Sequence, residues 1–306
     1  MDFDKAMLAW TLPWDADWVT AVALLGRSRR LAAGNNLGEI LVWDLPQKPD
    51  KPGGSVSPVR RLAGHTNVIS KLLSTVDGRW LVSASYDHTI RCWYMQSPGD
   101  KEEKIVLNAR AIEEADSPAG RRAGRKAPPP HEAEVRLQQA ARTLGGRRSQ
   151  PRSSVGHKEW VTSLAMSRDE KLLLSGDDAG QVILWDRAGG TEQRRWQVKG
   201  WAHAVALSPD NKLALVSERV PLVFDSGQHS AVRIWDIASA QPKLDLSKDF
   251  KMYIGAAAYS PDGKLLALGR GGEAEGQLFL VDPSNGKKLR ELTPKHEYGI
   301  TDLVFQ

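Results

Sequence analysis

The stretch VILWDRAGG, at Val182–Gly190, has near-copies elsewhere in the chain. ILVWDLPQK starts at Ile40 and VRIWDIASA at Val232, while TIRCWYMQS, from Thr89, keeps the Trp and loses the Asp. In each copy a short run of strand-forming residues leads up to the Trp, and residues typical of a turn follow it. The copies therefore indicate an internal repeat, which decides the fold before any other feature is considered.

The repeat extends on the N-terminal side of each copy. WVTAVALLGRSRRLAAG from Trp18 aligns without a gap with WVTSLAMSRDEKLLLSG from Trp160. WAHAVALSPDNKLALVS from Trp201 and YIGAAAYSPDGKLLALG from Tyr253 follow the same template, and NVISKLLSTVDGRWLVSA from Asn67 fits with one extra residue. Each block reads as an apolar strand, a turn and a second strand, so the strand that ends in Trp is the third of its unit.

The spacing of the repeat identifies its architecture. The Trp residues stand at positions 43, 93, 185 and 235, and Val281 takes the place of a fifth. The spacings are 50, 92, 50 and 46 residues, and the long one contains a basic segment of about 50 residues. A period in the forties with three or four short strands is typical of a propeller blade.

The chain resembles the WD40 repeat β-propeller family, in a degenerate, bacterial-type form. The Trp-Asp pairs at Trp43-Asp44, Trp185-Asp186 and Trp235-Asp236 carry the resemblance, together with Gly-His at Gly64-His65 and Gly156-His157. The resemblance covers nearly everything outside residues 97–153. It implies an all-β propeller whose third-strand Trp fills the gap between blades and donates its indole N–H to a buried network.

The resemblance also implies which residues form that network. The second unit has the full set: His65, Ser83 or Ser85, Asp87 and Trp93. The third has His157, Ser175 and Trp185, but Ala179 stands where the turn Asp aligns, and Asp178 is one residue away. The first unit has neither His nor Asp in register. We expect these residues to stabilise the fold and not to catalyse a reaction.

The repeat predicts five complete four-stranded blades. They span roughly residues 17–46, 64–96, 156–188, 200–238 and 251–283, and GITDLVFQ at 299–306 reads as the first strand of a sixth. Residues 6–12 read as the outer strand of the blade that comes last in the chain. The expectation is therefore a fragment of a longer, seven-bladed ring, since such rings close by pairing their terminal strands.

The basic charge of the chain belongs to one segment. The net charge is +5, and residues 101–155 hold 12 Lys/Arg against 7 Asp/Glu, so the other residues balance. Residues 97–153 are rich in Arg, Pro and Gly, which predicts a largely disordered insertion. KIVLNA, from Lys104, reads as the outer strand of the second blade. Nucleic acid or an acidic partner could bind only through residues 117–153, and a solvated loop is the simpler interpretation.

One aligned position points to function. The residue before the first strand of each blade is Trp18, Asn67, Trp160, Trp201 or Tyr253, which is aromatic in four of five units. Aromatic side chains carry much of the binding energy at protein interfaces, although packing between blades would also explain them. The leading hypothesis is a non-catalytic scaffold that binds extended segments or partner domains on the propeller face, in the cytoplasm or in an exported parent protein.

The alternative is a propeller enzyme with its site at the channel mouth. The acidic pair Asp17 and Glu159 precedes two of the aromatic residues and would have to supply the chemistry. No phosphate-binding loop, dinucleotide fingerprint or nucleophile elbow occurs, and the histidines lack metal-ligand spacing. The single cysteine, Cys92, excludes an internal disulfide, and no apolar run is long enough to span a membrane. We therefore expect no enzyme activity, no metal and no cofactor.

Overall fold

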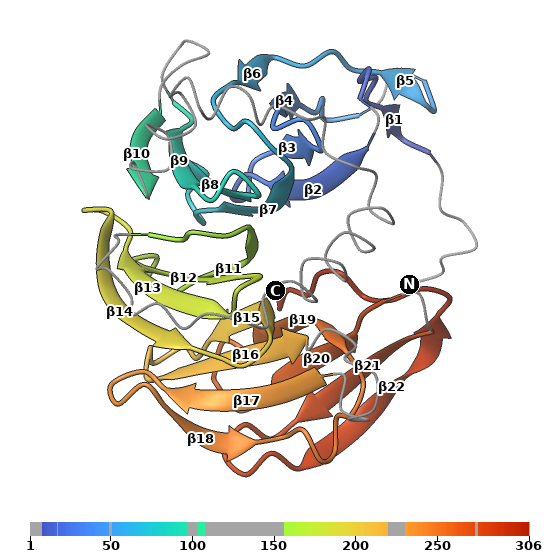
Figure 1. Cartoon of the computed structure of the whole chain (residues 1–306). Coiled ribbons are helices and arrows are strands. Elements are labelled where there is room, and N and C mark those ends of the chain that lie inside the picture. The colour runs from blue at the N-terminus through green and yellow to red at the C-terminus, as the bar shows by residue number, and fades with distance from the viewer. Residues whose placement is uncertain are drawn as a thin grey trace, which may run out of the picture. The chain divides into compact units, whose positions relative to one another are not determined.

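The computed structural model describes residues 8–16, 18–48, 51–96, 103–107, 156–219, 230–272 and 275–305. All the regular secondary structure in these ranges is β-strand. The chain divides into two compact units, Met1–Val106 and Leu107–Gln306, each of which contains several repeats and is described separately (Figure 1). No helix within the described ranges is long and apolar enough to cross a membrane.

The first unit holds two four-stranded sheets, here called blades 1 and 2. Blade 1 consists of β2 (Val19–Leu24), β3 (Arg30–Asn35), β4 (Ile40–Asp44) and β6 (Arg60–Leu62). Blade 2 consists of β7 (Ile69–Ser74), β8 (Trp80–Ser85), β9 (Ile90–Tyr94) and β10 (Glu103–Leu107). A separate parallel pair joins β1 (Trp10–Thr11) to β5 (Gly54–Ser55).

The second unit holds three four-stranded sheets, blades 3 to 5. Blade 3 contains β11 (Val161–Met166), β12 (Leu172–Asp177), β13 (Gln181–Asp186) and β14 (Thr191–Gln197). Blade 4 contains β15 (Trp201–Leu207), β16 (Leu213–Arg219), β17 (Ser230–Asp236) and β18 (Gln241–Asp245). Blade 5 contains β19 (Ile254–Tyr259), β20 (Leu266–Arg270), β21 (Gly276–Val281) and β22 (Lys288–His296). Each is an antiparallel meander in chain order, which is the form of a propeller blade.

A repeated turn joins the first two strands of these blades. In three of them a serine hydroxyl donates to an aspartate two residues later and accepts the backbone N–H five residues later, at Ser167, Ser208 and Ser260. Thr75 does the same in blade 2. The residue three positions after the hydroxyl adopts a positive φ, and it is Gly78, Glu170, Asn211 or Gly263. The SPDG-like sequences thus fold locally into the hairpins that the repeat requires.

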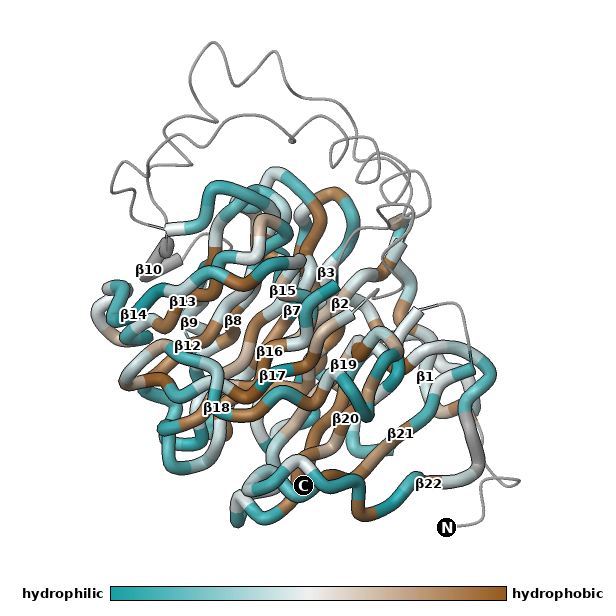
Figure 2. Tube along the Cα trace, turned by 60° about the horizontal axis from the view of Figure 1, so that its bottom comes forward, coloured by the Kyte–Doolittle hydropathy of each residue, from teal (hydrophilic) through white to brown (hydrophobic). Residues whose placement is uncertain are grey.

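Neighbouring blades of one unit approach at a small residue on the second strand. A Cβ added to Gly34 would lie 2.6 Å from the Ile69 side chain, and one on Gly176 would lie 2.5 Å from Cβ of Ala202. Apolar side chains fill the remaining space between the sheets. Figure 2 accordingly colours much of β16, β17 and β20 as hydrophobic. The cluster between blades 3 and 4 includes Leu174, Val182, Val205 and Val216.

The chain after blade 5 differs from the prediction. Residues 299–305 form no strand, in contrast to the first strand of a sixth blade expected at 299–306, because a strand needs a hydrogen-bonded neighbour and no described strand pairs with these residues. Ile300 nevertheless donates its N–H to the carbonyl of Arg270 at 2.7 Å. Its side chain meets Gly269 as Ile69 meets Gly34, so Ile300 occupies the place where a following blade would begin.

Two further predictions fall on the edges of the described ranges. Residues 6–12 were expected to be the outer strand of the last blade, but the pairing described for Trp10–Thr11 is with Gly54–Ser55. The strand predicted from Lys104 is confirmed as β10, the outer strand of blade 2. The rest of the insertion at 97–153, including 117–153, lies outside the described residues.

Candidate functional site

A buried polar network links the strands of blade 2. The Nδ1 atom of His65 lies 2.7 Å from Oδ2 of Asp87, and its Nε2 atom lies 2.7 Å from Oγ of Ser83. The indole Nε1–H of Trp93 donates to the same serine oxygen at 2.8 Å. Ser85, the other candidate for this role, instead donates to the carbonyl of Asn67. The side chains of His65, Ser83, Asp87 and Trp93 therefore meet, as the repeat pattern anticipates.

The protonation state of this network follows from its surroundings. Burial lowers the pKa of His65, and the carboxylate of Asp87 opposes this only in part. Burial also acts to raise the pKa of Asp87, but the His65 ring and a hydrogen bond from Thr89 hold that pKa well below its ordinary range. A neutral ring can donate Nδ1–H to Asp87 and accept the Ser83 hydroxyl at Nε2. The serine oxygen then accepts the Trp93 indole, so every polar atom is satisfied.

Blade 3 builds the same network with a different acid. His157 contacts Oγ of Ser175 at 2.6 Å through Nε2, and Trp185 donates to that oxygen at 2.8 Å. The carboxylate that meets Nδ1 of His157, at 2.7 Å, belongs to Asp177. The repeat alignment places Ala179 at this position and Asp178 one residue away, and neither supplies the carboxylate. Asp177 is the last residue of β12, two residues before the turn position that aligns with Asp87, and its carboxylate still reaches the His157 ring.

The connectivity of Ser, His and Asp in both blades is that of an acyl-transfer triad, yet the geometry does not suit catalysis. Ser83 and Ser175 are fully buried, and their oxygens already accept an indole N–H. A nucleophile must be within reach of a substrate, and neither serine is. Both networks therefore stabilise the blades, and each joins a third-strand Trp, through the serine, to a His that precedes the first strand.

The other framework tryptophans lack this connection. Among the described residues, the indole nitrogens of Trp43 and Trp235 have no hydrogen-bond partner. Trp43 instead packs edge-on against Trp14, with ring centroids 5.8 Å apart, and Trp235 packs against Trp196 at 6.1 Å. The third-strand Trp is thus held by hydrogen bonds in blades 2 and 3 and by aromatic packing in blades 1 and 4.

The aromatic column identified in the sequence has a defined place in each blade. The carbonyls of Trp18, Trp160 and Tyr253 each accept the backbone N–H of the first residue after the second strand. In blade 4 the corresponding residue, Trp201, pairs with Arg219. In blade 2 the equivalent acceptor is the carbonyl of Val68, not Asn67. We therefore define the aromatic column as Trp18, Val68, Trp160, Trp201 and Tyr253.

The sequence alignment places Asn67 in this column. The extra residue of the second repeat is Asn67 itself, so the column residue of blade 2 is Val68. The Asn67 side chain accepts the N–H of Val68 at 2.8 Å and donates to the carbonyl of Tyr86 at 3.5 Å. These contacts shape the approach to β7. The signal that could have revealed the error is the register, because Ile69 pairs with Ser85 as Val161 pairs with Asp177.

The aromatic column differs from the framework tryptophans in exposure. Trp18 is 50% exposed, and Trp160, Trp201 and Tyr253 are half-buried. Trp43, Trp93 and Trp185 are at most 1% exposed. Two classes of tryptophan with different roles therefore occur at two fixed positions of the repeat.

Charged groups accompany the column in blade 3. Asp178 follows β12, and its N–H donates to the carbonyl of Trp160. Burial, the Glu159 carboxylate and the Asp177 carboxylate raise the pKa of Asp178 to about 7. Glu159 is exposed, and its partner in the proposed acidic pair, Asp17, lies outside the described residues. No group of three potential metal ligands occurs in the described part of the chain.

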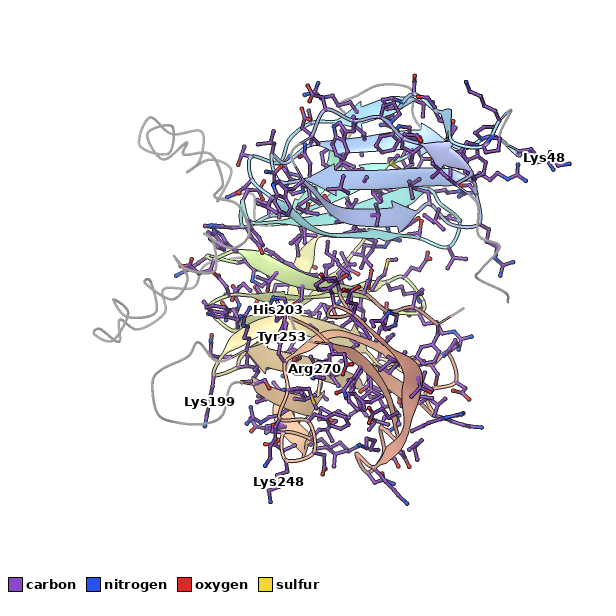
Figure 3. The ribbon with its side chains drawn as sticks, turned by 90° about the vertical axis from the view of Figure 1, so that its right-hand side faces the viewer. Lys48, Lys199, His203, Lys248, Tyr253 and Arg270 are labelled. Atoms are coloured by element: carbon purple, nitrogen blue, oxygen red, sulfur yellow. The ribbon has the colours of Figure 1, made fainter. Side chains whose placement is uncertain are left out.

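Blades 4 and 5 carry an aromatic and cationic cluster at the same edge. The guanidinium carbon of Arg219 lies 5.7 Å from the Trp201 ring centroid and 5.2 Å from that of Tyr253. The hydroxyl of Tyr253 hydrogen-bonds the ring of His203. We call these four residues the Arg219 cluster. Figure 3 labels His203 and Tyr253 beside Arg270, the last residue of β20.

Comparison with known proteins agrees with the repeat. The model of the family "WD domain, G-beta repeat" matches residues 56–94 and 149–186. The chain contains WD40 repeats. The "Small ribosomal subunit protein RACK1" of Neurospora crassa is 25% identical over 299 residues, which is 96% of this chain and 86% of the relative. The protein of the same name from Medicago sativa is 27% identical, over 82% of this chain and 85% of the relative.

A shorter similarity joins part of the chain to a protein of a different name. The "Target of rapamycin complex subunit LST8" of Saccharomyces cerevisiae is 30% identical over 81 residues, which is 26% of this chain and 26% of that protein.

The two WD40 repeats that the family model matches are those with a complete His–Ser–Trp network. Residues 56–94 include His65 and Trp93, and residues 149–186 include His157 and Trp185. Blades 1, 4 and 5 keep the WD40 strand order without these hydrogen bonds. A match to the family model therefore coincides with the hydrogen-bond network, and the strand order alone does not produce one.

Proposed function

We propose that this WD40 chain is a non-catalytic protein-interaction scaffold, and that the aromatic column contacts the partner. Extended segments or partner domains bind at the blade edge where the first strand begins and the second strand ends. The proposal includes a cytoplasmic setting, by similarity to relatives that are named as proteins of the small ribosomal subunit.

The contrast between buried and exposed tryptophans carries the proposal. Rings at the third-strand position fill the core, whereas Trp18, Trp160, Trp201 and Tyr253 keep part of their surface in water at an equivalent position. Partly exposed aromatic side chains on rigid strands are enriched where binding energy is concentrated. Rigid presentation also lowers the entropy lost on binding. Within the second unit, Trp160, Trp201 and Tyr253 are therefore suited to contact an extended partner at several points.

The names of the relatives support an assembly role. RACK1 is named as a protein of the small ribosomal subunit, and LST8 is named as a subunit of the target of rapamycin complex. Both names describe members of larger assemblies. By similarity, we propose that this chain also works as a component that holds other proteins.

The experiment compares affinity capture by the tagged full-length chain and by its Trp160→Ala and Trp201→Ala variants. Proteins from a cytosolic extract are cross-linked, captured and identified by mass spectrometry. Loss of the same specific partners in both variants is the expected result, because each substitution removes an aromatic contact and leaves the blade core intact.

Trp80→Ala is the matched control. Trp80 is a half-buried tryptophan that begins β8 at the opposite edge of its blade, where it packs against Tyr94 with ring centroids 5.2 Å apart. Its removal should keep the captured partners. Equal capture by the parent chain and by both column variants would contradict the proposal.

A further inference from the structure

One position of the repeat reverses its charge between neighbouring blades. The residue that faces the column residue across the first two strands is Asp178 in blade 3 and Arg219 in blade 4. β12 and β15 are in direct contact through Gly176 and Ala202, so the two positions belong to adjacent blades. The column residue beside each is a tryptophan. At these two blades the edge is therefore aromatic, with carboxyl groups at blade 3 and a guanidinium at blade 4.

The positive side is built to hold a guanidinium in place. Arg219 lies over both Trp201 and Tyr253, at 5.7 and 5.2 Å from their ring centroids. Stacking on aromatic faces restricts the planar guanidinium, and the N–H donors lie in that plane, at its rim. His203 contacts Tyr253 edge-on, with ring centroids 4.8 Å apart, and fixes the second aromatic wall. A stacked guanidinium of this kind recognises a planar carboxylate through two parallel hydrogen bonds.

The surrounding charges favour an anion at this cluster. The carboxylate of Glu218, next to Arg219, is buried, and it accepts the backbone N–H of Lys199 and pairs with Arg233. The Arg233 guanidinium therefore compensates the charge of Glu218 within blade 4. Arg270, which Figure 3 labels beside Tyr253, adds a second cation at the end of β20.

The acidic side of the edge selects between classes of anion. Glu159 and Asp178 stand at the adjacent blade, with Asp177 close enough to both to raise the pKa of each carboxyl. A nucleic acid strand carries a charge at every nucleotide and would place phosphates beside these carboxyl groups, which offer no cation to pair with them. A peptide can place one acidic side chain at Arg219 and a neutral or basic residue over blade 3.

We propose that the Arg219 cluster binds the carboxylate side chain of an acidic residue in an extended peptide segment. This inference rests on the proposed function, since it names the chemistry of the partner that the aromatic column contacts. The peptide crosses from blade 4 to blade 3, with its acidic residue over Trp201 and Tyr253.

The test is selection from a displayed library of random 12-residue peptides on the full chain, followed by affinity measurement with fluorescein-labelled selected peptides. The expected peptides contain Asp or Glu, and replacing that residue by Asn or Gln weakens binding at least about tenfold. Arg219→Gln should weaken binding similarly. Arg219→Lys keeps the charge but loses the bidentate geometry, so an intermediate loss is expected. Arg290→Gln, at an exposed arginine of β22, is the control that should bind normally.

The outcomes separate this inference from the proposed function. Selected peptides that need Trp160 and Trp201 but show no preference for acidic residues would overturn the inference and leave the scaffold function standing. Selected peptides that bind Trp160→Ala and Trp201→Ala variants as tightly as the parent would overturn both. A labelled 12-nucleotide single-stranded RNA that binds, and loses binding in Arg219→Gln, would also overturn the inference in favour of nucleic acid. Unchanged thermal midpoints establish that each variant is folded.

Discussion

Oδ2 of Asp177 lies 2.7 Å from Nδ1 of His157, although Asp177 precedes by two residues the position from which Asp87 reaches His65. The other oxygen of Asp177 accepts the backbone N–H groups of Ala179 and Gln181, at 3.1 and 2.8 Å. One carboxylate therefore completes the His network and also shapes the hairpin that follows β12. This double use makes Asp177 the most heavily engaged acid of blade 3.

Asp177→Ala should destabilise the chain by about 3 kcal/mol, because it leaves a buried histidine nitrogen and two turn N–H groups without their acceptor. Thermal and urea unfolding measure the effect. Glu192→Ala, at a partly exposed ion pair with Arg195, is the comparison, and it should cost about 1 kcal/mol or less. Equal losses in the two variants would show that Asp177 does not act through the network.

Ser175→Ala tests the centre of the same network. The substitution leaves Nε2 of His157 and Nε1 of Trp185 buried without a partner, and each orphaned group costs about 1–3 kcal/mol. The free energy of unfolding should therefore fall by at least about 2 kcal/mol. Ser284→Ala, at an exposed turn serine, should change it by less than about 0.5 kcal/mol. A Ser175→Ala variant as stable as the parent would mean that the network contributes no net stability.

Asp178 makes stability depend on pH. Its pKa is raised from 3.8 to about 7 by burial and by the carboxylates of Glu159 and Asp177, so the folded chain binds a proton that the unfolded chain has lost. Stability therefore falls as pH rises from about 4 to about 7. Asp178→Asn should remove this loss and stabilise the chain at pH 8 by about 2 kcal/mol, after allowance for solvent screening.

The measurement is the difference in thermal midpoint between Asp178→Asn and the parent across the pH range 4 to 8. The difference should grow with pH and should be small at the acidic end. Asp186→Asn, at another partly exposed carboxyl of blade 3, is the control. A constant difference at all pH values would contradict the assignment of the titration to Asp178.

Glu170 occupies a backbone position that suits glycine. Its φ is 58°, and the equivalent turn residue is Gly78 in blade 2 and Gly263 in blade 5. A non-glycine residue in the left-handed region costs roughly 1–2 kcal/mol. Glu170→Gly should therefore raise the free energy of unfolding by about 0.5–1 kcal/mol, since glycine also loses more entropy on folding. The converse change, Gly263→Glu, should lower the free energy of unfolding. Urea unfolding of both variants measures whether the two changes have opposite signs.

The two classes of tryptophan should respond differently to truncation. Trp185→Ala removes a fully buried ring and should cost about 3–5 kcal/mol. Trp160→Ala removes a half-buried ring that projects from the start of β11, and it should cost about 1 kcal/mol. Calorimetric unfolding of both variants measures the contrast. A large loss in Trp160→Ala would place that ring in the core and remove it from the proposed binding surface.

Much of the fold could be predicted from the sequence because the repeat states the same strand pattern several times. The turn serines and the third-strand Trp fix the strand order, and His65 and His157 appear at matching positions. The acid of blade 3 cannot be found from a fixed spacing, because a carboxylate at the end of β12 reaches the same His nitrogen as one in the turn after β8. Asn67 was misplaced because an inserted residue can lie on either side of a strand start, and only the pairing of Ile69 with Ser85 decides which.

The candidate site was less accessible to sequence reasoning. The position of the aromatic residues could be found, but their exposure could not, because Trp160 and Trp185 differ in burial and not in residue type. The Arg219 cluster was missed altogether. Arg219 ends one strand while Tyr253 precedes another strand of the next blade, so only the packing of blade 4 on blade 5 brings them together.

The hydrogen bond at Trp18, Val68, Trp160 and Tyr253 uses the backbone carbonyl of that residue, so it does not depend on the identity of the side chain. Val68 and Trp160 occupy equivalent positions with the same backbone bond. Substitutions here can therefore change what the surface recognises without altering how the blade assembles. Over evolutionary time, such a chain can exchange partners one blade at a time, and a designer could graft a new specificity by rewriting these few side chains alone.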